Sequence, residues 1–129
     1  MNFKKHNPQA VSPAVGNYAH AIEIEPGFRY LFISGQIPEK PDGTVPLSFE
    51  DQCNAVWDNI FDIMKSANMG PENLVKVTTF LTHADQAEAN GQIRRQRLGE
   101  LTPALTVVIV QTLDSKWLLE IEAVAAAKA

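Results

Sequence analysis

The sequence contains few of the residues that cross-link a chain or hold a metal. Cys53 is the only cysteine among 129 residues, which excludes an internal disulfide framework and fits a reducing compartment. Because Phe49, Cys53 and Trp57 recur at helical spacing, this thiol is expected in the core and not as a nucleophile. The three histidines are scattered and show no ligand spacing. We therefore expect no metal and no other cofactor.

An excess of basic residues and a long apolar run near the start are also absent. The formal net charge of −4 argues against a nucleic-acid partner, which needs a concentrated basic patch. The only basic cluster, Arg94, Arg95 and Arg97, would spread around a helix, which favours solvated side chains over a phosphate site. The first nine residues are polar, so we expect no secretion signal, no membrane span and a cytoplasmic protein.

The residues that are present predict one α+β domain over residues 1–129, without repeats or linkers. Alternation and turn residues predict strands at 18–25, 29–34, 74–81, 105–110 and 118–125. A first helix is predicted at 49–68, with Ser48 as its N-cap and Gly70 at its C-terminal end, and a second at 85–99. The predicted order is β-β-α-β-α-β-β.

The last strand carries two carboxylates on an otherwise apolar segment. Glu120 and Glu122 are two residues apart and share one face, whereas Leu119 and Ile121 belong to an apolar face that should pack under helices. The carboxylates are explained by solvent or by a basic neighbour at the rim. The alternative is a pocket in which a carboxylate orients water or accepts a proton, and the periodicity of the strand does not distinguish the two.

The strands also predict an oligomer. Both pleat faces of 105–110 are apolar, and so, largely, are those of 74–81. Two helices cover only one face of such a sheet, so a partner subunit should cover the other. Alternatively, the N-terminal segment and the proline-rich loop 38–48 fold over that face.

Four motifs occur in the order and spacing of a known family. They are Tyr18-Ala19-His20-Ala21, Ser34-Gly35-Gln36-Ile37-Pro38, Gln52 with Asn59-Ile60, and Pro103-Ala104 followed by Glu120-Ile121-Glu122-Ala123. Together they resemble the Rid family over residues 13–126: reactive-intermediate imine deaminases, also called YjgF-like proteins or endoribonuclease L-PSP. The resemblance implies a chorismate-mutase-like fold, with a single mixed β-sheet and two helices on one face. It also implies homotrimers that bind a small-molecule substrate in pockets at the subunit interfaces.

The resemblance assigns catalysis to Glu120 and Tyr18. In the family, the matching carboxylate orients the water that attacks the imine carbon, and the tyrosine forms a hydrogen bond near the substrate nitrogen. His20 lies two residues after Tyr18 and shares its strand face, which suits proton transfer. A half-buried strand tyrosine and a structural histidine are the alternative explanations.

Further positions are assigned to substrate binding. Ser34 and Gly35 end a strand, and the glycine lets backbone amides approach a ligand closely. Asn90 matches the family's active-site asparagine, although an early-turn or solvent-exposed asparagine explains it as well.

Leu105 and Val107 would line the pocket and depart from the family pattern. Family members that hydrolyse 2-imino acids carry, after Pro-Ala, an arginine that grips the substrate carboxylate, and many carry a cysteine two residues later. Leucine offers neither charge nor donor, so the usual 2-imino acids are expected to be poor substrates. Arg29, or Arg94 one helical turn after Asn90, could supply the charge instead.

Three functions follow from these residues. The first is hydrolysis of a small imine, enamine or related intermediate, with Glu120 activating water. The second is a trimer that binds a small molecule without catalysing a reaction, which Leu105 and Val107 favour. The third, RNA cleavage, has only the arginine cluster in its favour.

Overall fold

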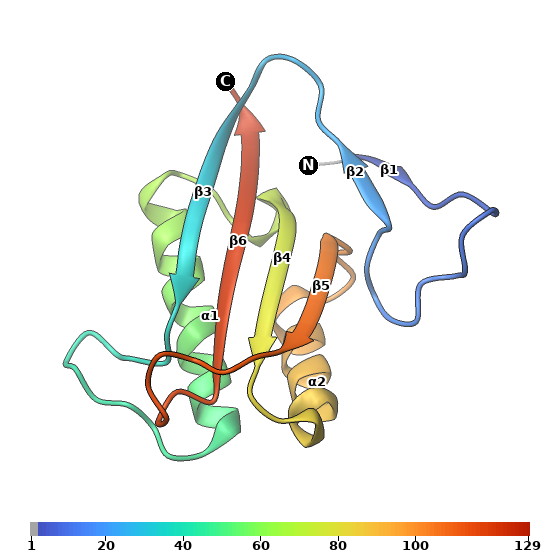
Figure 1. Ribbon diagram of the computed structural model, residues 1–129. Helices are drawn as coiled ribbons and strands as arrows, with labels where there is room; N and C mark the ends of the chain where they lie inside the picture. Colours follow the sequence, from blue (N-terminus) through green and yellow to red (C-terminus); the bar gives the residue numbers. More distant parts are fainter. Residues whose placement is uncertain (1–2) are drawn as a thin grey trace.

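The computed structural model describes residues 3–129 and is built around a four-stranded mixed sheet. The strands lie in the order β3-β6-β4-β5, and both helices pack behind one face (Figure 1). The bounds are β3 Phe28–Gln36, α1 Phe49–Ser66, β4 Leu74–Leu81, α2 Ala87–Leu98, β5 Ala104–Ile109 and β6 Leu119–Lys128. β6 runs antiparallel to β3 and β4, whereas β4 and β5 are parallel. The predicted α+β class is confirmed.

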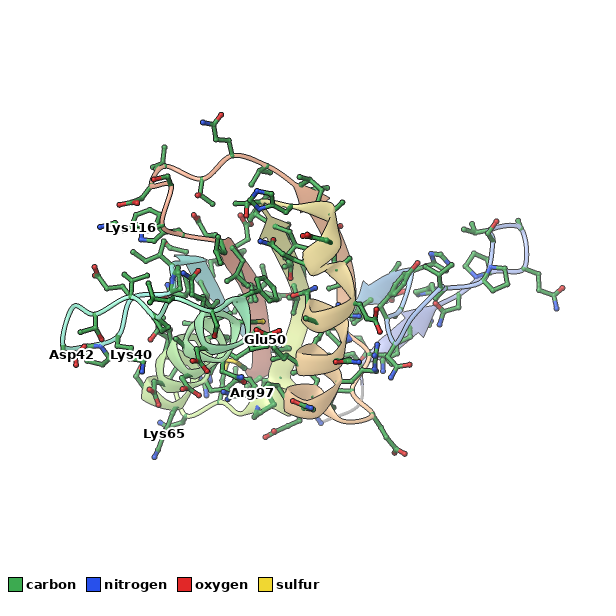
Figure 2. All side chains as sticks on the ribbon, turned by 90° about the horizontal axis from the view of Figure 1, so that it is seen from below. Lys40, Asp42, Glu50, Lys65, Arg97 and Lys116 are labelled. Carbon is green, nitrogen blue, oxygen red and sulfur yellow. The ribbon has the colours of Figure 1, made fainter. Side chains whose placement is uncertain are left out.

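The N-terminal region forms a separate two-stranded ribbon, which the sequence did not predict. β1 (Lys4–His6) pairs antiparallel with β2 (Ala21–Glu23), outside the main sheet. A single parallel bridge, Ala19 to Ala104, joins this region to the edge at β5, and the ribbon extends away from the body (Figures 1 and 2). Both strands are short and mostly exposed, so neither has an apolar alternation that local sequence could reveal. The strand predicted at 18–25 is therefore shorter, and it pairs with β1 outside the main sheet.

Both helices begin close to the predicted residues but differ at their boundaries. The hydroxyl of Ser48 accepts a hydrogen bond from the backbone N–H of Asp51, as an N-cap should. α1 ends at Ser66 because Asn68 adopts the left-handed conformation, at φ +56°. Gly70 was therefore the wrong terminator, and it instead precedes a short 3₁₀ helix, Pro71–Asn73. A second 3₁₀ helix, Ala84–Gln86, replaces the first residues predicted for α2. Gly99 follows the end of α2 at φ +60°.

The two faces of the sheet differ in cover. Leu119 and Ile121 of β6 are fully buried beneath the helices, as predicted. The opposite face has no such cover: Phe32 of β3 is 77% exposed, and Val108 of β5 is exposed as well. Neither the N-terminal ribbon nor loop 38–48 buries these side chains. This face is thus open in the single chain, and it exposes apolar side chains of β3 and β5.

Gln52 and Asn59, the two polar residues of the motif on α1, hold neighbouring loops by hydrogen bonds. The buried Gln52 amide donates to the carbonyls of Pro46 and Lys116 and accepts from the backbone N–H of Leu118. Asn59 donates to the carbonyls of Ile37 and Glu39. Their role in this structure is therefore to tie the proline-rich loop and the segment before β6 to the helix. No helix within residues 3–129 is long and apolar enough to cross a bilayer.

Candidate functional site

A cleft of about 570 Å³ lies between α2, β5 and the segment that leads to β2. Its walls include Val15, Tyr18, Asn90, Arg94, Leu105 and Val107. Four of the eight predicted site residues are thus brought together: Tyr18, Asn90, Leu105 and Val107. The tyrosine arrives from the N-terminal segment because the bridge at Ala19 holds that segment against β5.

Helix α2 presents two polar side chains to this cleft. Asn90 and Arg94 are one turn apart, so their side chains lie on the same helical face. They are only 2% and 8% exposed, respectively. Among the described residues, neither side chain has a hydrogen-bond or ion-pair partner. An amide and a guanidinium therefore border the cleft with unused hydrogen-bonding capacity.

The charge of Arg94 is held in partly desolvated surroundings. Burial lowers the pKa of this guanidinium from its usual value, and the nearby positive charge of Arg95 lowers it further. The group stays cationic nonetheless, since an arginine side chain is not deprotonated in proteins. Glu88 and Arg95 also line the cleft, both on exposed positions of α2. Nη2 of Arg94 lies 3.8 Å from the point where a Cβ on Gly16 would stand.

Strand β5 supplies an apolar wall. Leu105 and Val107 lie beside Val77 and Thr79 in the parallel register, so they face the helix side of the sheet. Val15, at the mouth of the cleft, is 96% exposed. The cleft therefore combines polar groups from one helix with aliphatic walls.

His20 does not line this cleft. Its ring lies edge-on to the Tyr18 ring, with 5.7 Å between the centroids. The ring Nε2 lies 2.7 Å from the carbonyl oxygen of Ser12, and its backbone N–H donates to Oδ1 of Asn7. The histidine thus holds the N-terminal loop and supports Tyr18 from the side.

Glu120 lies on the opposite face of the sheet. It pairs in register with Phe80, whereas the cleft-lining Val107 pairs with Thr79, so the two side chains point to different faces. Gly35 lies in the irregular end of β3, and a Cβ built there would stand 2.9 Å from Cδ of Glu120. Only a glycine leaves the carboxylate in this place. Ser34 precedes Gly35 in the same irregular stretch of β3, so the second group of predicted site residues in this chain is Glu120, Ser34 and Gly35.

The sequence did not predict that Arg94 would be buried. The cluster of three arginines indicated solvated side chains, and the only signal for a cleft residue was the spacing from Asn90. The other candidate, Arg29, donates to the carbonyl of Ala67 at the end of α1. Arg29 therefore serves as a cap for that helix.

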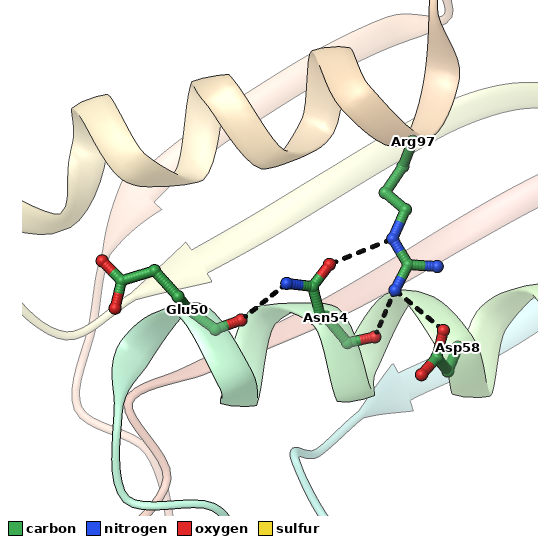
Figure 3. Close-up of polar contacts among 4 residues, drawn as sticks. All are labelled: Glu50, Asn54, Asp58 and Arg97. Carbon is green, nitrogen blue, oxygen red and sulfur yellow. Dashed lines mark hydrogen bonds and ion pairs between the residues drawn. The ribbon is translucent and has the colours of Figure 1, made fainter.

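Arg97 is held between the two helices (Figure 3). Its guanidinium donates to Oδ1 and to the carbonyl of Asn54, at 3.1 Å each, and forms an ion pair with Asp58 at 2.8 Å. It also lies over the ring of Phe61. Arg94 is buried at the cleft, Arg95 is exposed beside it and Arg97 lies between the helices, so the three arginines form no single basic stripe.

The cysteine does not line the cleft. Cys53 is fully buried, and burial raises the pKa of its thiol to about 12, as expected for a core cysteine. Within residues 3–129, no three side chains of histidine, cysteine, aspartate or glutamate gather in a way that could hold a metal.

Comparison with known proteins gives a consistent match over the whole fold. The family model described as "Endoribonuclease L-PSP" matches residues 9–127. A RutC family protein of Aquifex aeolicus is 35% identical over 121 residues, which cover 92% of this chain and 94% of that protein. The crystal structure of YyfB from Yersinia pestis, a member of the Rid protein family of unknown function, superposes with a TM-score of 0.85. It is 27% identical and covers 98% of this chain and all of its own.

A third relative carries a functional name. The Escherichia coli protein named "Putative reactive intermediate deaminase TdcF" is 28% identical over 121 residues, which cover 91% of this chain and 92% of TdcF. Its crystal structure with bound serine superposes with a TM-score of 0.72, at 26% identity, and covers 97% of this chain and 99% of TdcF.

Proposed function

Because this chain belongs to the Rid family, which includes the endoribonuclease L-PSP and RutC family proteins, we propose that it hydrolyses a small imine or enamine-type intermediate. The name of TdcF supports a deaminase reaction. The observation that carries the proposal is the cleft itself, where Tyr18 and Asn90 meet a space large enough for a metabolite.

The complete site is a composite of two subunits in a homotrimer. Tyr18 and Asn90 line the helix-side cleft, whereas Glu120 lies on the open face, so one chain cannot place all three around one substrate. The open face of a neighbouring copy would bring its own Glu120 to the cleft. The exposed Val15 at the cleft mouth and Phe32 on the open face support this arrangement, since both need cover.

In this site, the carboxylate of Glu120 accepts a proton from water while the water oxygen attacks the carbon of the C=N bond. The imine nitrogen takes up a proton, and the resulting carbinolamine collapses to a carbonyl compound and ammonia. The Tyr18 hydroxyl forms a hydrogen bond to the nitrogen. Asn90, with a free amide, holds the substrate.

Leu105 replaces the arginine that imino-acid-hydrolysing relatives carry on this strand. A carboxylate beside Leu105 would lose a charge-assisted pair of about 1.5–3 kcal/mol. We therefore propose that the substrate does not bind against β5 in the way of the usual 2-imino acids. Serine bound to TdcF indicates that a relative accepts a small carboxylate-bearing ligand.

A binding trimer without chemistry is the second candidate. The aliphatic walls Leu105 and Val107 favour it, because they supply neither a charge nor a nucleophile. RNA cleavage has less support, since the three arginines of α2 are dispersed. For either small-molecule role, a cytoplasmic location remains our expectation.

A pair of glutamine variants tests the enzymatic function. Ammonia release from freshly generated 2-imino acids and neutral imines is measured with the wild type, Glu120→Gln and the matched control Glu122→Gln. Glu122 lies two residues along the same strand face, beside Thr78, so its substitution removes the same charge outside the site. We expect Glu120→Gln to lose activity by about a hundredfold or more and Glu122→Gln to retain it. Equal loss in both variants, or none in either, contradicts the proposal.

A further inference from the structure

We infer that Arg94 of α2 binds the acidic group of the substrate, so that this cleft takes a small carboxylate-bearing imine whose acid lies against the helix. This inference rests on the proposed function, because it names the substrate class of the same cleft. It assigns to helix α2 the role that Leu105 cannot perform on β5.

The burial of Arg94 is the first support. Arg94 is only 8% exposed, and its Nη2 lies 3.8 Å from the point where a Cβ on Gly16, another residue of the cleft, would stand. Burying a guanidinium without a partner is costly, and proteins compensate such charges. No carboxylate within residues 3–129 forms an ion pair with it. A ligand in the cleft can therefore supply the compensating anion.

Arg97 differs from Arg94 in that its guanidinium has hydrogen-bond and ion-pair partners. Three residues further along α2, Arg97 uses two acceptors on Asn54 and the carboxylate of Asp58. The same helix therefore supplies one arginine whose donors are used in packing and one whose donors remain available. A helix-packing role does not explain Arg94.

The shape and surroundings of the cleft select the anion. A planar guanidinium presents two parallel N–H donors, which match the two oxygens of a carboxylate. The Asn90 amide, one turn away on the same face, can donate to the same group or to a neighbouring substrate atom. Leu105 and Val107 line the cleft with aliphatic surface that suits a short alkyl side chain. Glu88 and Arg95, on exposed positions nearby, carry opposite charges and add little net field.

Binding of a stable product analogue tests this inference without catalysis. Calorimetric titrations compare 2-oxobutanoate with its uncharged amide, 2-oxobutanamide, on the wild type, Arg94→Gln, Arg94→Lys and Lys65→Gln. Lys65 lies in the last turn of α1 and does not line the cleft, so it controls for net charge. We expect the wild type and Lys65→Gln to prefer the carboxylate by about tenfold or more. Arg94→Gln should lose that preference, and Arg94→Lys should keep part of it.

Two results would overturn the inference. The first is a carboxylate preference in Arg94→Gln equal to that of the wild type, or no preference in the wild type. The second is a drop in trimer stability of Arg94→Gln by size-exclusion chromatography without any change in preference, because Arg94 would then pair with a neighbouring subunit. The proposed function fails separately: ammonia release in Glu120→Gln equal to the wild type would reject the hydrolase, while Arg94-dependent binding would still establish the anion site.

Discussion

Arg94 and Leu105 line the same cleft from different elements, the guanidinium from helix α2 and the isobutyl group from strand β5. One is a buried charge without a partner among the described residues, and the other is an apolar side chain on the wall formed by β5. If Arg94 binds the acidic group of the substrate, an additional arginine on β5 should crowd the cleft. In Leu105→Arg, two guanidinium groups would share one cleft and repel each other. We expect this variant to bind 2-oxobutanoate no better than the wild type, whereas a tenfold gain would mean that Arg94 does not serve the carboxylate.

Gly35 and Glu120 form a second pair that can be tested directly. A methyl group on Gly35 would stand within 3 Å of the Glu120 carboxyl carbon, so Gly35→Ala should displace the carboxylate. We expect the kcat for imine hydrolysis to fall about as far as in Glu120→Gln. The double variant Gly35→Ala/Glu120→Gln should be no worse than either single variant, because both changes remove the same group. Additive losses would separate the roles of the two residues.

Arg97 should matter for stability and not for substrate. Arg97→Ala removes two hydrogen bonds to Asn54, the ion pair with Asp58 and the contact with Phe61, so we expect unfolding to become easier by about 1–3 kcal/mol in urea titrations. Asp58→Asn should cost less, since Asp58 is largely exposed. A stable Arg97→Ala protein with weakened 2-oxobutanoate binding would reverse this assignment.

Gln52 should be among the most sensitive polar residues. Gln52→Ala leaves two carbonyls and one N–H without their buried partner, at an expected cost of about 3 kcal/mol or more. Gln92→Ala, at an exposed position of α2, provides the control and should change stability by less than about 0.5 kcal/mol. Similar midpoints for the two variants in a urea titration would contradict the role of Gln52.

Cys53 should make the stability of the folded protein fall at high pH. Its pKa is raised to about 12 in the folded protein, so the unfolded chain loses the thiol proton first as the pH rises above about 9. The stabilisation that comes from keeping this thiol protonated is fully present below about pH 9. The free energy of unfolding then falls between about pH 9 and 12, by up to about 1.4 kcal/mol per pH unit. Cys53→Ala should remove this part of the slope. In the folded wild type at pH 8, the thiol should resist alkylation by iodoacetamide until urea unfolds the protein.

Local sequence predicted the elements whose signals are local, and it failed where the partner is distant. Ser48 capped α1 as expected because capping needs only neighbouring residues. Asn68, and not Gly70, ended that helix, since asparagine also tolerates the left-handed conformation. β1 was missed because its pairing depends on residues 15 to 19 positions away.

The site followed the same pattern. Periodicity placed Glu120 on the face away from the helices, and the motifs named Tyr18 and Asn90, which line one cleft. The burial of Arg94 could not be predicted, because it depends on how the N-terminal segment lies against β5. That arrangement is a property of tertiary packing.

The central claim, that one subunit supplies the cleft and the next supplies Glu120, is tested most directly by mixing inactive variants. Glu120→Gln and Asn90→Ala are unfolded together in equal amounts, refolded into mixed trimers, and assayed for ammonia release from imines. Random assembly pairs an intact cleft with an intact Glu120 at about one interface in four, so about a quarter of wild-type activity should return. Activity no higher than the mean of the two separately refolded variants would place the whole site within one chain and contradict the account.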